Sequence, residues 1–105
     1  MITIQIISRS GVDAYKMLRD KVTHEAQTWS WKNKEKTRLV HTRGPGYIQV
    51  TGSGSLVTAQ IHPKDDNAFF LVEKLIGRLV AWFPHDLFAI NMQFIPDESK
   101  AKKRR

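Results

Sequence analysis

The chain has 105 residues, of which 41% are hydrophobic and 26% charged, and it contains no cysteine. This composition is typical of a folded domain and excludes wholesale disorder, a membrane-spanning architecture and any chemistry that needs a thiolate. The formal net charge of +7 indicates a polyanionic partner if the positive charge is concentrated in patches.

The first predicted elements are a strand over residues 2–7, whose isoleucines alternate with other side chains, and a helix that follows it. Ser10 and Asp13 mark the start of this helix, because a hydroxyl can cap free N–H groups and an acid is favoured in the first turn. Apolar residues then recur at three- and four-residue intervals and predict one buried stripe. The stripe consists of Tyr15, Leu18, Val22, Ala26 and Trp29.

Three more strands are expected over residues 36–42, 47–51 and 55–62. Glycine-containing turns at 44–46 and 52–54 separate them, because glycine permits the positive φ that a chain reversal needs. Three consecutive strands with such short connections predict an antiparallel meander.

A second helix is expected after residues 65–67, whose sequence Asp-Asp-Asn supplies candidate N-cap side chains. Pro84 ends this helix, because proline cannot continue the hydrogen-bond ladder. Phe69 belongs to its apolar arc, whereas Phe70 falls on the polar side. An exposed Phe70 would mark a candidate partner surface.

The last strand is expected over residues 87–95, with alternate apolar side chains turned inward. The inward set is Phe88, Ile90, Met92 and Phe94. The element order predicts an α+β two-layer sandwich: a five-stranded, mostly antiparallel sheet with both helices on one face. Residues 1–96 are expected to form a single domain with a polar, almost uncharged outer sheet face, and residues 97–105 a basic, unfolded C-terminal tail.

Cations occupy alternate positions after Trp31, and in an extended strand they would form a ladder with a repeat of about 6.6 Å. Residues 32–43 hold five cations and one acid, and residues 97–105 hold five cations and two acids, so these segments account for the whole net charge of +7. They predict a nucleic-acid-binding surface, because clustered cations release counterions from phosphates and tryptophan can stack on bases. The candidate residues are Trp31, Lys32, Lys34, Lys36, Arg38, Arg43, Lys102, Lys103, Arg104 and Arg105.

Other interpretations of the same residues stay open. Alternating lysines also protect a sheet edge against aggregation, and the stripe places Trp29 in the core. The four histidines have no metal-ligand spacing, and no serine stands in a nucleophile-elbow sequence. We therefore name no catalytic residue, no metal ligand and no cofactor.

The leading hypothesis is a small non-enzymatic binding protein that contacts nucleic acid or another polyanion through the basic strand and the tail. The first alternative is a protein-interaction or regulatory module, including a homodimer, with no nucleic-acid role. A small enzyme with an unrecognised site is the second alternative. The N-terminus does not resemble a signal peptide, so a cytoplasmic location with no membrane partner is expected.

Overall fold

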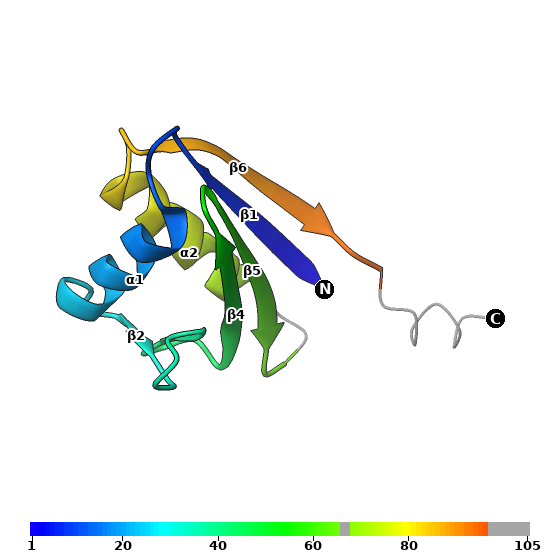
Figure 1. Ribbon diagram of the computed structural model, residues 1–105. Helices are drawn as coiled ribbons and strands as arrows, with labels where there is room; N and C mark the ends of the chain where they lie inside the picture. Colours follow the sequence, from blue (N-terminus) through cyan, green and yellow to red (C-terminus); the bar gives the residue numbers. More distant parts are fainter. Residues whose placement is uncertain (66–67, 97–105) are drawn as a thin grey trace.

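The computed structural model describes residues 1–65 and 68–96, and its centre is an antiparallel sheet of six strands (Figure 1). The elements in chain order are β1 (Ile2–Ser8), α1 (Ala14–His24), β2 (Trp29–Trp31), β3 (Arg38–His41), β4 (Gly46–Ser53), β5 (Leu56–Pro63), α2 (Phe69–Trp82) and β6 (Leu87–Phe94). The predicted α+β class is confirmed. The predicted number of strands is wrong by one, because β2 has three residues and gives no alternation that a sequence pattern could reveal.

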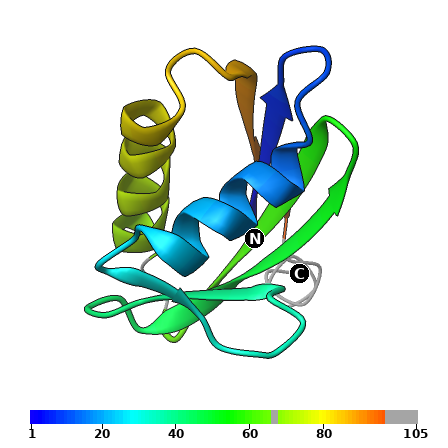
Figure 2. The same ribbon diagram turned by 60° about the vertical axis from the view of Figure 1, so that its left-hand side comes forward.

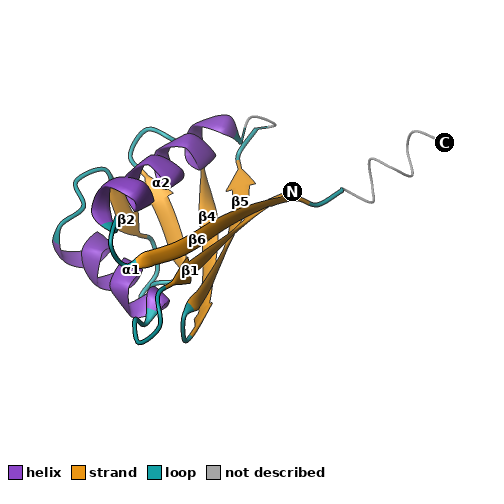
Figure 3. Ribbon diagram, turned by 90° about the horizontal axis from the view of Figure 1, so that it is seen from above, coloured by secondary structure: helices purple, strands orange, loops and turns teal. Residues whose placement is uncertain are grey.

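The strands lie side by side in the order β2-β3-β4-β5-β1-β6. The first strand of the chain is therefore an inner strand, and Ile4 lies opposite Ala59 of β5 and Met92 of β6. Both helices lie on the same side of the sheet (Figure 3). The strands β2 and β6 form the two edges.

Helix α1 is capped by Asp13, whose carboxylate accepts the N–H of Lys16 at 3.0 Å, and not by Ser10 as the sequence had indicated. The helix ends at His24, so Trp29 does not belong to it. Figure 2 shows the chain leaving α1 and entering the β2–β3 hairpin at the edge of the sheet. The prediction that Trp29 is a core residue is confirmed, since its side chain is 2% exposed.

The N-cap position of helix α2 is Ala68, and no side chain caps the helix there. The predicted cap Asp65 therefore does not occupy the N-cap position. Residues 66–67, the other predicted caps, lie outside the described residues. The two phenylalanines exchange the places expected for them: Phe69 is 68% exposed, whereas Phe70 is half-buried. The helix ends before Pro84 as predicted.

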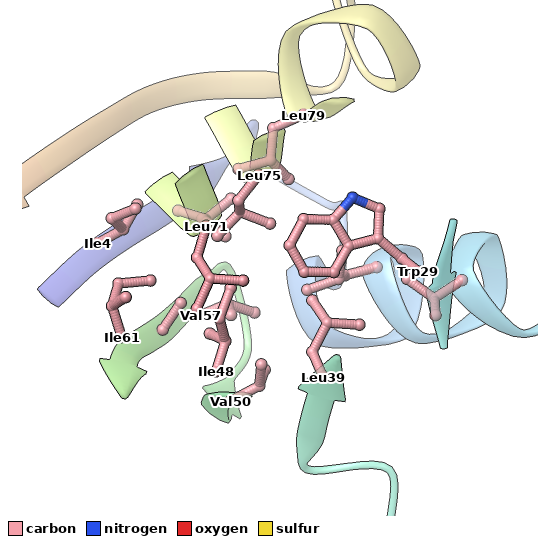
Figure 4. Close-up of a cluster of buried hydrophobic side chains, with 14 of the residues drawn as sticks. Ile4, Trp29, Leu39, Ile48, Val50, Val57, Ile61, Leu71, Leu75 and Leu79 are labelled. Atoms are coloured by element: carbon pink, nitrogen blue, oxygen red, sulfur yellow. The ribbon is translucent and has the colours of Figure 1, made fainter. Parts of the chain in front are cut away.

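The hydrophobic core lies between the helices and the inner strands (Figure 4). Leu71, Leu75 and Leu79 of α2 project towards the sheet, and Trp29 closes the core on the side of β2 and β3. The sheet contributes Ile4, Leu39, Ile48, Val50, Val57 and Ile61, all of them at most 2% exposed. Large side chains from both layers are thus removed from water, which is the main stabilising contribution to this fold.

Strand β6 has the predicted alternation but not the predicted burial. Ile90, Met92 and Phe94 lie opposite Ile6, Ile4 and Ile2, so they share the face that the helices cover elsewhere. Phe94 is nevertheless 73% exposed, Phe88 72% and Met92 37%. The inward prediction holds for Ile90, which packs against the core, and fails for the other three because α2 packs over β5 and leaves this edge of the sheet uncovered.

The outer face of the sheet carries a row of polar residues across five strands. Arg38 lies opposite Gln49, Gln49 opposite Gln60, Gln60 opposite Thr3, and Thr3 opposite Gln93. The strand register therefore produces the polar, almost uncharged face that alternation predicts. Separately, neither α1 nor α2, the helices within the described residues, is long and apolar enough to span a membrane.

Candidate anion-binding site

The predicted ladder of cations is not a strand. Residues 32–37 form a loop between β2 and β3, and the side chain of Asn33 organises it. The Asn33 Oδ1 accepts the backbone N–H groups of Thr37 and Arg38, each at 3.0 Å, and its Nδ2 donates to the Thr37 Oγ1 at 2.7 Å. These side-chain bonds stabilise a turn in place of an extended ladder. Lys36 has a φ of 56°, which ends the alternation.

Two of the predicted basic side chains, one on the loop and one at the start of β3, point in different directions. The Lys36 Nζ donates to the Thr23 Oγ1 on α1 at 3.2 Å. Arg38 lies on the outer sheet face, where its guanidinium is 5.0 Å from the centre of the Tyr47 ring. Lys36 therefore contacts the helix layer, whereas Arg38 lies on the opposite face of the sheet.

Trp31 is half-buried between the loop and α1. Its indole N–H donates to the Arg19 carbonyl at 3.3 Å, and its ring lies 6.5 Å from that of Tyr15. Lys32 and Lys34 are exposed. The predicted tail residues Lys102, Lys103, Arg104 and Arg105 lie outside the described residues.

A hollow of about 650 Å³ opens where the end of α1, the β2–β3 hairpin and α2 meet. We call it the Trp29 pocket. Its charged and aromatic lining residues are Glu25, Trp29, His41, Arg43, Phe70, Lys74, Arg78 and Trp82. Of the residues predicted to bind nucleic acid, only Arg43 lies here among those described.

Helix α2 supplies one wall of the Trp29 pocket from a single line of side chains. Phe70, Lys74, Arg78 and Trp82 follow one another at intervals of four, so they lie on one flank of the helix. The sequence contains this signal, a basic and aromatic row beside the apolar arc. Sequence reasoning missed it because Phe70 was considered alone on the polar side of the helix and not as the first member of this row.

The lining of the Trp29 pocket is positively charged. Arg43, Lys74 and Arg78 stand against a single carboxylate, Glu25. Glu25 already binds Lys21 at 3.0 Å. Across residues 1–65 and 68–96, no salt bridge involves the three pocket cations. The Lys74 Nζ lies 5.5 Å from the centre of the Phe70 ring, and no carboxylate among the described residues neutralises the three charges.

His41 contributes a neutral ring to the pocket wall. Desolvation, with smaller contributions from Lys74 and Arg43, lowers the pKa of His41 below its ordinary value of 6.5. Its Nδ1 accepts the backbone N–H of Arg43 at 3.1 Å. The proton of the neutral ring therefore resides on Nε2, which makes this atom a donor. The ring is held edge-on between Trp29 and Phe70, at 4.8 and 5.1 Å between centroids.

The indole N–H of Trp29 is buried and has no acceptor among the described residues. Figure 4 shows the indole nitrogen on the side of α2. An unpaired buried N–H costs about 1–3 kcal/mol, so Trp29 carries an uncompensated donor in the core beside the pocket. The neutral His41 ring and the three cations line one hollow, an arrangement that suits a negatively charged, acceptor-rich group.

Comparisons with known proteins add no function to this geometry. No protein-family model, no curated protein and no solved structure matches this chain. In the part of the chain that the structure describes, no three His, Cys, Asp or Glu side chains lie close enough to hold a metal ion. Function is therefore inferred from the Trp29 pocket alone.

Proposed function

We propose that the protein is a non-enzymatic binding protein whose Trp29 pocket takes a phosphate group and an adjacent base of single-stranded nucleic acid. One observation carries this proposal. Three cations without salt bridges, Arg43, Lys74 and Arg78, line the same hollow as the aromatic rings of Phe70 and Trp82.

A phosphate suits these groups because its oxygens accept several hydrogen bonds and carry negative charge. Arginine binds phosphate through two parallel N–H donors, and lysine adds a point charge. Each neutralised phosphate also releases counterions, which strengthens binding at low salt.

A base suits the aromatic part of the wall. Phe70 and Trp82 line the pocket beside the two α2 cations, Lys74 and Arg78. Stacking of a base on an aromatic ring contributes about 1–3 kcal/mol and requires an unpaired base. The volume of about 650 Å³ lies within the usual range for sites that enclose a small organic group. A single strand therefore fits better than a duplex.

The predicted residues outside the pocket take a secondary role in this proposal. Lys32 and Lys34 are exposed on the β2–β3 loop and add to the positive field of the protein. The basic residues 102–105 add non-specific attraction for phosphate. A cytoplasmic location agrees with such a partner.

The experiment compares two triple variants that remove the same charge from different places. Arg43, Lys74 and Arg78 are changed to glutamine in one, and Lys32, Lys34 and Arg38 in the other. Fluorescently labelled single-stranded and duplex oligonucleotides are titrated over a salt series. Loss of the contacts to the one phosphate in the pocket lowers the magnitude of the slope of log affinity against log salt by about 0.7 for a single strand.

We expect this change in slope only for the pocket variant, together with a preference of the wild type for single strands. Equal losses in the two variants would show that charge acts without a site. Unaltered binding by the pocket variant, or no measurable binding by the wild type at low salt, would overturn the proposal.

A further inference from the structure

The outer edge of β6 has free backbone donors and acceptors. Met1 and Ile95 exchange two backbone hydrogen bonds, of 2.8 and 2.7 Å, so the groups of Ile95 face β1. In an antiparallel pair, such residues alternate with residues whose N–H and C=O groups point away. The backbone groups of Ile90, Met92 and Phe94 therefore face outward, along the edge seen in Figure 1. Among the described strands, none pairs there.

This edge lacks the features that keep sheet edges apart. Natural edges are usually short, charged or covered, because a free edge can pair with another chain. The β2 edge follows this rule, with three residues and a loop that contains lysines. Strand β6 has eight residues, and none of the residues 87–96 is charged.

Apolar side chains surround the same edge. On β6 and its continuation the exposed set includes Phe88, Met92, Phe94 and Ile95. Helix α2 adds Phe69 and Val80, which are 68% and 56% exposed. These two lie on the flank of α2 away from the Trp29 pocket. Together with Met1, these residues expose roughly 700 Å² of mostly apolar surface, judged from the areas of such side chains.

We infer that two copies of the chain pair through β6 in antiparallel orientation, about a two-fold axis at Met92, so that their sheets become continuous. Met92 of one copy then lies opposite Met92 of the other, and Ile90 lies opposite Phe94. Every outward N–H and C=O group of one edge thus meets an outward group of the other.

A second copy is the occupant that the edge itself specifies. An uncharged strand can face its own copy without repulsion, even though the chain carries a net charge of +7. The pairing is isologous, so one surface serves both partners. Burial of the whole of this apolar area, roughly 700 Å² per copy, would approach the share of about 800 Å² that each partner contributes to a standard interface.

This inference is independent of the proposed function. The Trp29 pocket lies at the β2–β3 end of the sheet, whereas β6 is the opposite edge. Loss of nucleic-acid binding would leave the dimer intact, and loss of the dimer would leave the pocket intact.

The first test uses two matched substitutions. Met92 and Leu56 are each 37% exposed, but Leu56 begins β5, which β1 separates from β6, so it does not lie on the unpaired edge. Sedimentation equilibrium should give a dimer mass for the wild type and for Leu56→Lys, and a monomer mass for Met92→Lys. A wild type that stays monomeric over a range of protein concentrations that spans about 100-fold and ends at its solubility limit would overturn the inference. A dimeric Met92→Lys would also overturn it.

The second test does not depend on disrupting the strand. The chain has no cysteine, so Met92→Cys introduces a unique thiol. Hydrogen-bonded antiparallel residues have Cα atoms about 5.5 Å apart, which is within disulfide range. Mild oxidation should convert most of Met92→Cys to a covalent dimer, with little from Leu56→Cys. Equal crosslinking of the two variants would overturn the proposed pairing.

Discussion

Substitution of Trp29 by phenylalanine tests whether the buried indole N–H is an uncompensated donor. Trp29 is 2% exposed and its N–H has no acceptor in the described part of the chain. A phenylalanine keeps an aromatic ring in the core and removes the unpaired donor. The substitution therefore has two opposing effects on the free energy of unfolding.

The unfavourable effect is the space left by the smaller ring. A difference of roughly 40 Å³ at about 24 cal/mol per Å³ destabilises the fold by about 1 kcal/mol. Removal of the unpaired N–H recovers about 1–3 kcal/mol. We expect the free energy of unfolding of Trp29→Phe to equal that of the wild type or to exceed it by up to about 2 kcal/mol.

Trp31→Phe is the matched control, because the indole N–H of Trp31 has an acceptor. It donates to the Arg19 carbonyl at 3.3 Å, so its loss should destabilise the protein by about 1 kcal/mol. Urea unfolding followed by circular dichroism at low protein concentration measures both variants without relying on tryptophan fluorescence. A Trp29→Phe variant less stable than Trp31→Phe would refute the assignment of Trp29 as an unpaired donor.

Three further changes test backbone strain, helix propensity and the charge state of the pocket. Gly46→Ala should destabilise the fold by at least about 2 kcal/mol, because the φ of residue 46 is +101°. The new Cβ would also meet the His62 carbonyl oxygen and lie 2.7 Å from the Lys64 nitrogen. An unchanged urea midpoint would contradict this expectation. Gly77→Ala should stabilise the exposed face of α2 by about 0.5–1 kcal/mol, since nothing lies within 4 Å of the added methyl group; thermal unfolding measures it. The folded pKa of His41 is lowered from 6.5, so protonation favours the unfolded chain, and the contribution of His41 to stability is lost as the pH falls from 6.5 towards the folded value. An NMR titration should show this lowered pKa, and a rise when inorganic phosphate binds; no response to phosphate would argue against an anion beside the ring.

The strands and helices with regular apolar spacing could be predicted from sequence, and the short or locally stabilised segments could not. The isoleucines of β1 alternate because one face of that strand is buried. Trp29 fits the stripe of α1 by number although it belongs to β2, and pairing with His41 of β3 brings it into the same core. Three-residue strands carry too few side chains for any period to appear.

The loop after β2 shows why alternate lysines were a misleading pattern. Spacing by two is the signature of a strand only if backbone groups pair with a neighbouring strand. The Asn33 side-chain oxygen accepts hydrogen bonds from two backbone N–H groups, those of Thr37 and Arg38. A single amide thus decides the conformation of the loop, and its effect depends on geometry that charge patterning does not contain.

The Trp29 pocket could not be predicted as a site because its parts come from distant segments. Arg43 follows β3, whereas Lys74 and Arg78 lie on α2, and the sheet order and helix packing bring them together. The exposed edge was missed for a related reason. Alternation predicts which face Met92 and Phe94 share, but only the position of α2 determines whether that face is covered.

The place of β1 in the sheet has a consequence for how the chain folds. Both neighbours of β1 lie far along the sequence, since Ile2 is opposite Ile61 and Phe94. Such distant pairings slow folding, because a long loop must close before the contacts form. During synthesis, β1 leaves the ribosome before β5 and β6, so it has no strand to pair with until the residues of β5 and then β6 follow. A ribosome-bound chain that stops before residue 87 would present β1, with Ile4 and Ile6, as its open sheet edge.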